Sequence, residues 1–438
     1  MIPASLAALL TTLALAAPEP ARPPVDDQVT SSKTSGVDLL VKRRPGADFV
    51  SIQLYVLGGS RNWTAASAGV EALAFRVAAS GGAGTLDKEE FGRELARLGA
   101  SVTASTGRDW SVLAAKGPTR NFSLIFRMLA DTFTSPALPK SEVELQRGQL
   151  VVQLQQRGEN PDGRLGELVT QALFTGHPYA NPPDGTLQSV PKLDLAAVNG
   201  HLKKLRERSR LLLVVVGDVE PARVQAAVTA LLGGLPAGTF KATPLPRPTF
   251  KAARLVTERR VIPTNYIQAM APAPGPGEAG YVAARVGGAA LWQRLFVEVR
   301  TKRNLSYAPG ARYDVNGAGG WAGIYVTAVD PDTTVPIMLG ELKKLADQPL
   351  DAAELEGTKS MYRTQLLMGQ ETTDDEAAGL ARGLLHAGDW GFTRKVLAES
   401  ARVTAAEVQA AARGAYRNLQ FVLLGDPAKL DPKLLGLK

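Results

Sequence analysis

Cysteine is absent from the 438-residue sequence, and histidine occurs only three times. Without cysteine the chain can form no disulfide, no thiolate nucleophile and no cysteine-based metal site. The three histidines, His177, His201 and His386, are far apart in the sequence, and none lies in a recognisable triad motif. An enzyme that relies on such residues is therefore the least favoured class of function.

Aromatic residues are also scarce, at 6% of the chain, and long apolar runs are missing after the N-terminus. The formal charge is +8, but the basic residues are scattered among acidic ones. A nucleic-acid-binding domain usually gathers its basic residues into a stripe or patch. The charge-rich run at residues 201–210 is interpreted as a solvated helix face. The composition favours a globular protein that binds no nucleic acid and has no membrane span.

The N-terminal segment has a different composition from the rest. Residues 1–16 lack charged side chains and are rich in Ala and Leu, and Ala14-Leu15-Ala16 has the small-x-small pattern of a signal-peptidase site. We expect a secretory signal peptide at residues 1–16 and an exported protein, periplasmic in a bacterium; the alternative is a disordered or mis-started N-terminus. Residues 17–35 are Pro-rich and polar, which predicts an unstructured lead-in.

Local patterns predict alternating strands and helices in the first half. Apolar segments at residues 37–44 and 50–57 flank Pro45-Gly46 and predict a hairpin. Apolar residues at helical spacing predict a helix within residues 69–82, with Ser67 as its N-cap and Gly81-Gly82 as its stop. Further helices are predicted at 86–98, 121–133, 140–156 and 221–232, and further strands at 101–106, 110–115 and 211–218.

The second half of the sequence repeats the first. Residues 195–218, a helix, a basic turn and an apolar strand ending in Gly-Asp, are echoed by residues 405–426, and residues 137–156 by 349–370. A Pro-rich linker is predicted at residues 234–253. Two copies that each mix antiparallel strands with helices predict a tandem α+β architecture.

The glycine pattern of residues 69–82, the strand before it and the segments after it resemble the first domain of the insulinase/pitrilysin family, of the mitochondrial-processing-peptidase type. The resemblance covers nearly the whole mature chain. It implies an α+β fold of two tandem homologous domains, each a mixed, mostly antiparallel sheet packed with helices on one side. These domains would occupy residues 36–233 and 254–438.

The family's zinc motif is degenerate in this sequence. In active members the first helix carries H-x-x-E-H, in which two histidines four residues apart bind one zinc ion and the glutamate activates a water. In that register this chain has Ala72, Phe75 and Arg76, and the family's later pair of glutamates falls on Gln146 and Gln153. A methyl group replaces the first ligand and a phenyl ring replaces the base. A guanidinium, which stays protonated, replaces the second ligand, and an amide replaces the third. The resemblance therefore implies a chain without catalytic zinc or another cofactor.

A second family signature is retained. Residues 293–308 carry an Arg and a Tyr seven residues apart, matched by Arg300 and Tyr307, while Asn304 replaces the usual Gly. The resemblance implies a substrate clamp in which both side chains donate hydrogen bonds to the scissile carbonyl and its developing oxyanion. On the residues alone, Arg300 could be a surface charge and Tyr307 a core residue at the start of a strand.

Residues 174–186 resemble a recurrent loop of the family, in which His177 precedes Pro178 and Tyr179. Because the family keeps this loop outside its metal centre, His177 is interpreted as a turn residue.

Some members of the family consist of two chains, of which one holds zinc and the other completes the chamber. A chain that lost the zinc ligands but kept Arg300 and Tyr307 resembles the second kind. The expected function is that of a non-catalytic subunit of a heterodimeric zinc peptidase, with a zinc-bearing H-x-x-E-H subunit as partner and unfolded peptides as substrates. The alternative is a scaffold or peptide-binding protein of the same fold, as in the family's respiratory-complex core subunits, in which the Arg/Tyr pair would be dispensable.

Overall fold

The computed structural model of this chain describes residues 29–437. The predicted signal peptide, residues 1–16, and residues 17–28 of the predicted lead-in lie outside the described residues. The unstructured lead-in was predicted to extend to residue 35, which is wrong, because Val29–Thr34 form strand β1. This strand pairs antiparallel with β2 (Val37–Arg43), so that its backbone groups join the first sheet.

The first half contains a six-stranded sheet in the order β1-β2-β8-β3-β7-β6. Its remaining strands are β3 (Phe49–Leu57), β6 (Ser101–Thr106), β7 (Trp110–Pro118) and β8 (Leu211–Gly217). The predicted hairpin of residues 37–44 and 50–57 is wrong, because β8 lies between β2 and β3, parallel to the first and antiparallel to the second. Every residue of β8 is buried, and a central position covers both faces of such an apolar strand.

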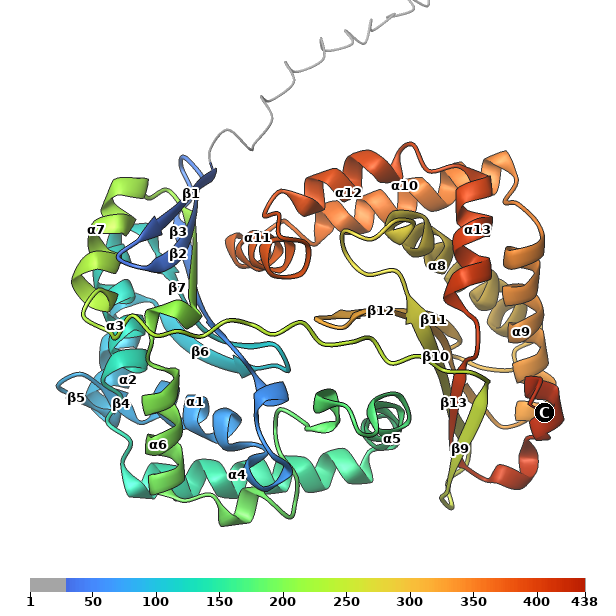
Figure 1. Ribbon diagram of the computed structural model, residues 1–438, viewed down its shortest axis with the longest axis horizontal. Coiled ribbons are helices and arrows are strands. Elements are labelled where there is room, and N and C mark those ends of the chain that lie inside the picture. The colour runs from blue at the N-terminus through green and yellow to red at the C-terminus, as the bar shows by residue number, and fades with distance from the viewer. Residues whose placement is uncertain (1–28, 438) are drawn as a thin grey trace, which may run out of the picture.

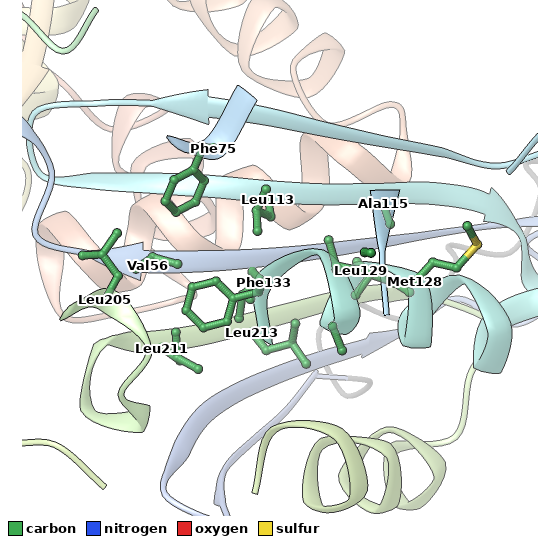
Figure 2. Packing of buried hydrophobic residues seen from close by; sticks show 14 of the residues in the cluster. Val56, Phe75, Leu113, Ala115, Met128, Leu129, Phe133, Leu205, Leu211 and Leu213 are labelled. Carbon is green, nitrogen blue, oxygen red and sulfur yellow. The ribbon is translucent and has the colours of Figure 1, made fainter. Parts of the chain in front are cut away.

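The predicted helices of the first half are confirmed and cover one face of this sheet (Figure 1). Their bounds are α1 (Val70–Ser80), α2 (Lys88–Leu98), α3 (Phe122–Thr134), α4 (Lys140–Glu159), α6 (Leu195–Leu205) and α7 (Pro221–Leu232). A small hairpin of β4 (Gly82–Ala83) and β5 (Leu86–Asp87) connects α1 to α2. Apolar side chains from the sheet and the helices form a single buried cluster between the two layers (Figure 2).

Local chemistry sets both ends of α2 but not the predicted start of α1. Asp87 caps α2 by accepting a hydrogen bond from the Glu90 N–H, and Gly99 ends it in the left-handed conformation. The predicted N-cap Ser67 is wrong: α1 begins after Gly69, whose φ is 88°. A Cβ on Gly69 would lie 2.8 Å from the Asp184 carbonyl oxygen, so this close approach requires glycine.

The second half repeats this topology. Its strands are β9 (Arg254–Arg259), β10 (Asn265–Ala273), β11 (Gly310–Asn316), β12 (Gly319–Ala328) and β13 (Gln420–Gly425), in the order β11-β12-β10-β13-β9. Its own helices are α8 (Tyr281–Leu295), α9 (Pro331–Asp347), α10 (Ala352–Met368), α12 (Phe392–Ser400) and α13 (Ala405–Ala415). β13 runs parallel to β9 and antiparallel to β10, as β8 does to β2 and β3. The predicted repeat and the tandem α+β fold are confirmed.

Each half also lends one helix to the other. Helix α5 (Pro161–Phe174) packs on the second sheet, against side chains that alternate with those facing that sheet's own helices, and α11 (Thr373–Ala387) packs in the same way on the first sheet. The linker residues 234–253 form no helix or strand and cross between the two halves (Figure 1). The apolar face of each exchanged helix therefore holds the halves together.

Within residues 29–437, none of the helices combines the length and the apolar character that crossing a bilayer requires.

Candidate functional site

The positions of the family's zinc ligands lie on α1 and α4, which pack against each other. The Arg76 guanidinium donates a hydrogen bond to the Gln153 side-chain oxygen at 2.6 Å. The structure therefore brings the positions of the second and third ligands together, as the resemblance implies. A charge-assisted hydrogen bond now joins the two helices at this point.

The other two motif positions have become part of the core. Ala72 is buried, and Phe75 is only 1% exposed. The phenyl ring of Phe75 lies on the apolar side of the first sheet near Val56 and Leu113 (Figure 2). The position that holds the catalytic base in active relatives thus contributes to packing here.

These side chains do not fit a zinc ion. Zinc in proteins is bound by imidazole nitrogen, thiolate or carboxylate. Ala72 and Phe75 offer no donor atom, Arg76 carries a positive charge, and the Gln153 oxygen already accepts the bond from Arg76. Across the described part of the chain, no three His, Asp or Glu side chains gather in a way that could hold a metal.

Gln146, the other glutamate position of the family, faces a separate cluster. Its side-chain amide donates to Glu142 Oε1 at 2.9 Å, and the same carboxylate accepts bonds from Ser80 and Lys88, both at 2.6 Å. Burial favours the neutral acid, but these donors outweigh it and the pKa of Glu142 is lowered. This cluster braces the C-terminal end of α1 against α4.

A buried polar network adjoins the degenerate motif, and sequence analysis missed it. Glu71 is 1% exposed, and its carboxylate accepts hydrogen bonds from Trp63 Nε1 at 3.0 Å and from the Ser111 hydroxyl. His201 Nε2 lies 3.0 Å from the same carboxylate. The Trp63 and His201 rings meet edge to face, 4.3 Å apart. These hydrogen-bond partners compensate the Glu71 carboxylate for the hydration that it loses on burial.

The prediction that residues 201–210 form a solvated helix face is therefore wrong for His201, which is 5% exposed. The signal that would have placed it is the spacing of Val198, Leu202 and Leu205, which mark the buried face of α6 and include His201 between them. Lys203 and Lys204 do face outward.

Arg300 and Tyr307 lie together in the second half. Arg300 belongs to a π-helical turn, Phe296–Thr301, that continues α8, and its guanidinium carbon lies 3.9 Å from the centroid of the Tyr307 ring. π-Helical turns occur frequently at functional sites. Tyr307 is 79% exposed, so the alternative of a core residue at a strand start is wrong.

Asn304 lies in the loop between these two residues with a φ of 51°. This left-handed conformation favours glycine, which the family has at this position, and Asn is among the few other residues that tolerate it. The replacement of Gly by Asn thus preserves the shape of the loop that presents Tyr307.

His177 has the predicted turn role. Its Nδ1 accepts a hydrogen bond from the Tyr179 N–H at 3.1 Å, and its Nε2 lies 3.1 Å from the carbonyl oxygen of Pro246 in the linker. Tyr179 is fully buried and donates its hydroxyl proton to Asp109. Asp109 also accepts the Gly317 N–H from the second half at 3.0 Å, so this loop belongs to the junction of the two halves.

His386 is separate from both other histidines. It lies on α11, with its ring 4.9 Å from that of Trp110, and burial lowers its pKa.

Comparisons with known proteins agree with this geometry. Residues 39–186 match the sequence model of the insulinase family (peptidase family M16), and residues 192–362 match that of the peptidase M16 inactive domain. An uncharacterized zinc protease of Mycobacterium leprae is 22% identical over 391 residues, covering 86% of each chain. One of Bacillus subtilis is 21% identical over 406 residues, covering 90% of this chain and 97% of its own.

Solved structures show the same fold. A peptidase M16 inactive domain from Pseudomonas fluorescens superposes with a TM-score of 0.82 at 19% identity, covering 91% of this chain and 97% of its own. A protease from Helicobacter pylori gives 0.83 at 17% identity, with coverages of 91% and 99%. A chain of complex III from Candida albicans gives 0.80 at 19%, with coverages of 93% and 99%. The two family matches, the duplicated sheets and the positions of the degenerate motif together show that this chain belongs to the insulinase (M16) family of peptidases, as a member that has lost the side chains of the zinc site.

Proposed function

We propose that this chain is the non-catalytic subunit of a two-chain zinc peptidase. It would complete the chamber and present Arg300 and Tyr307 to peptides bound at the zinc site of an H-x-x-E-H partner. The observation that carries the proposal is the contrast between the two signatures. The zinc positions have been rebuilt with a core phenyl ring and an Arg76–Gln153 hydrogen bond, whereas Arg300 and Tyr307 remain paired and accessible.

The Arg/Tyr pair has the chemistry that such a clamp needs. Among the described residues, Arg300 forms no ion pair with a carboxylate, so its N–H donors remain available to a ligand. The guanidinium stays protonated at neutral pH, and a phenol hydroxyl is a hydrogen-bond donor. Two such donors aimed at a peptide carbonyl would stabilise the negative charge that develops on its oxygen during attack. The metal chemistry would belong to the partner.

The test is to purify the mature chain alone and with its zinc-bearing partner, and to assay cleavage of an unfolded peptide. We expect no activity from the lone chain. Arg300→Ala in the complex should lower kcat/KM by about 100-fold or more, as loss of an oxyanion donor does elsewhere, and Tyr307→Phe should also lower it. The matched control is Arg303→Ala, because Arg303 lies in the same segment but pairs with Glu298.

Two outcomes contradict the proposal. One is cleavage by the lone chain that a chelator abolishes. The other is full activity of a complex carrying both Arg300→Ala and Tyr307→Phe. A neighbouring reading frame that encodes H-x-x-E-H would identify the partner to be used.

A scaffold or peptide-binding role is the second candidate, and the likeness to a chain of complex III favours it. That chain belongs to an assembly named complex III, not to a protein named as a protease. In this case the Arg/Tyr pair would be dispensable, and no peptidase would co-purify with the chain.

We also propose that the protein is exported, on the basis of the composition of residues 1–16. N-terminal sequencing of the protein from its native host should show that this segment has been removed. An intact N-terminus in the cytoplasmic fraction would contradict export.

A further inference from the structure

A cavity of about 300 Å³ lies in the second half, between α8, α10, α11 and α12. Arg285 of α8 and Arg382 of α11 line it, together with Tyr281, Tyr362 and Gln365. Neither Arg300 nor Tyr307 contributes to its wall. The cavity is therefore distinct from the clamp described above.

Arg285 is held in place by aromatic side chains. Its guanidinium carbon lies 5.3 Å from the ring centroid of Tyr313, 5.8 Å from that of Tyr362 and 6.0 Å from that of Tyr281. The faces of aromatic rings attract a cation, and rings on several sides fix its position. This cation is thus positioned before any ligand arrives.

Neither arginine of this cavity has an acidic partner. Within residues 29–437, no ion pair joins Arg285 or Arg382 to a carboxylate. Burial raises the pKa of Asp314, which the charges of Arg312 and Arg285 oppose, but no hydrogen bond connects Asp314 to Arg285. Arg382 is exposed, and burial lowers the pKa of the neighbouring His386.

Two other arginines in similar places are compensated by carboxylates. Arg294 also projects from α8 toward α10, and it forms two hydrogen bonds with Glu354, at 2.6 and 2.7 Å. In the larger cavity beside α5 in the first half, Arg164 is bound by Glu258 and Glu167. In the described part of the chain Arg285, which aromatic rings surround, has no such partner, and no Asp or Glu lines the cavity that it shares with Arg382.

A second cavity of about 260 Å³ shares Arg285, Tyr362 and Gln365 with the first and extends to Arg312 on the edge strand β11. Arg312 also has no ion pair among the described residues, and its guanidinium stacks on Tyr325 at 4.6 Å. The two cavities thus share a wall formed by Arg285, Tyr362 and Gln365.

We propose that the cavity between Arg285 and Arg382 binds a carboxylate group of a peptide, with the planar guanidinium of Arg285 as the main contact. A guanidinium fork matches the two oxygens of a carboxylate, and the cavity has room for one such side chain or for a C-terminal residue. The inference deepens the proposed function, on which the peptide nature of the ligand rests, by naming the class of peptide. It requires no partner subunit, so it can fail while the proposed function stands.

The test uses the mature chain alone and fluorescein-labelled nine-residue Gly/Ser peptides in an anisotropy titration. One peptide carries an internal Glu and an amidated C-terminus, a second has a free C-terminal carboxylate and no Glu, and a third has neither group. We expect the third peptide to bind at least about tenfold more weakly than one of the first two, because a charge-assisted hydrogen bond is lost. The first two peptides distinguish a side-chain from a C-terminal carboxylate.

Arg382→Gln and Arg285→Gln should each remove this preference. Arg363→Gln is the matched control, because Arg363 lies on α10 next to Tyr362 but faces away from the cavity. Since Arg285 is enclosed by rings and its replacement can disturb folding, the exposed Arg382 gives an independent measurement. Equal binding of all three peptides, or an unchanged preference in both cavity variants, would overturn the proposal. So would displacement of the peptides by inorganic phosphate at concentrations at which acetate has no effect.

Discussion

Replacement of Phe75 by glutamate, the residue of active relatives, tests whether the motif position has become part of the core. Phe75 is 1% exposed and packs with the buried side chains of the first sheet. Truncation of a buried Phe typically costs about 3–5 kcal/mol. Phe75→Glu loses the same apolar contacts and also buries a carboxyl group, so we expect it to lower the free energy of unfolding by at least about 3 kcal/mol.

The loss should depend on pH in a defined direction. Burial raises the pKa of a carboxyl group above its unfolded value of about 4.3, and Glu71, one turn earlier on the same helix, adds a like charge. The folded variant then binds more protons than the unfolded chain at any pH between the two pKa values. The stability penalty relative to the parent protein should therefore be smallest below about pH 4 and grow as pH rises, by at most about 1.4 kcal/mol per pH unit.

The measurement is urea unfolding of the protein between pH 4 and 8, followed by tryptophan fluorescence, to which Trp63 beside the site contributes. Phe75→Gln is the matched control, because it loses the same contacts but adds no titrating group. Phe75→Leu should cost much less than either. If Phe75→Glu stays within about 1 kcal/mol of the parent protein over the whole range, the phenyl ring is not a core residue and the packing argument fails.

Three further variants test other parts of the structure. Asp109→Ala removes an acceptor shared by the Tyr179 hydroxyl and the Gly317 N–H, so it should cost about 2–4 kcal/mol and increase proteolysis between the two halves; unchanged proteolysis would show that the junction does not depend on it. Glu71→Ala should cost about 3–5 kcal/mol in urea unfolding, because buried donors lose their acceptor, and a loss below 1 kcal/mol would contradict the network. Asn304→Ala should lower the melting temperature, whereas Asn304→Gly should not, because only the first is strained at a φ of 51°; equal effects would argue against this conformation.

Features encoded by neighbouring residues could be predicted from the sequence. The capping of α2 by Asp87 and its end at Gly99 depend on contacts within a few residues. The helix at Val70–Ser80 follows from apolar residues at helical spacing. The tandem fold also followed, since the second half repeats the order of elements in the first. That Ala72 and Phe75 lack donor atoms follows from the sequence once it is aligned with the family's zinc motif.

Features that depend on distant segments could not be predicted in this way. The hairpin of β2 and β3 was expected because they are adjacent in sequence, but β8, more than a hundred residues later, is the more apolar strand and takes the central place. His201 was assigned to a solvated face because its neighbours are charged, yet Glu71 binds it in the core. Neither the place of β8 in the sheet nor the contact between Glu71 and His201 can be identified from the residues that adjoin them in the sequence.

The sequence by itself determined the fold class, the repeat and the chemical incapacity of the old zinc positions, because residue types and short spacings suffice for these. Only the tertiary structure decided that α5 and α11 exchange between the halves, that Arg76 bonds Gln153, and that Arg285 and Arg382 face a cavity without an acid. Burial and charge compensation are properties of side chains brought together from distant parts of the chain, and a local pattern carries no record of those neighbours.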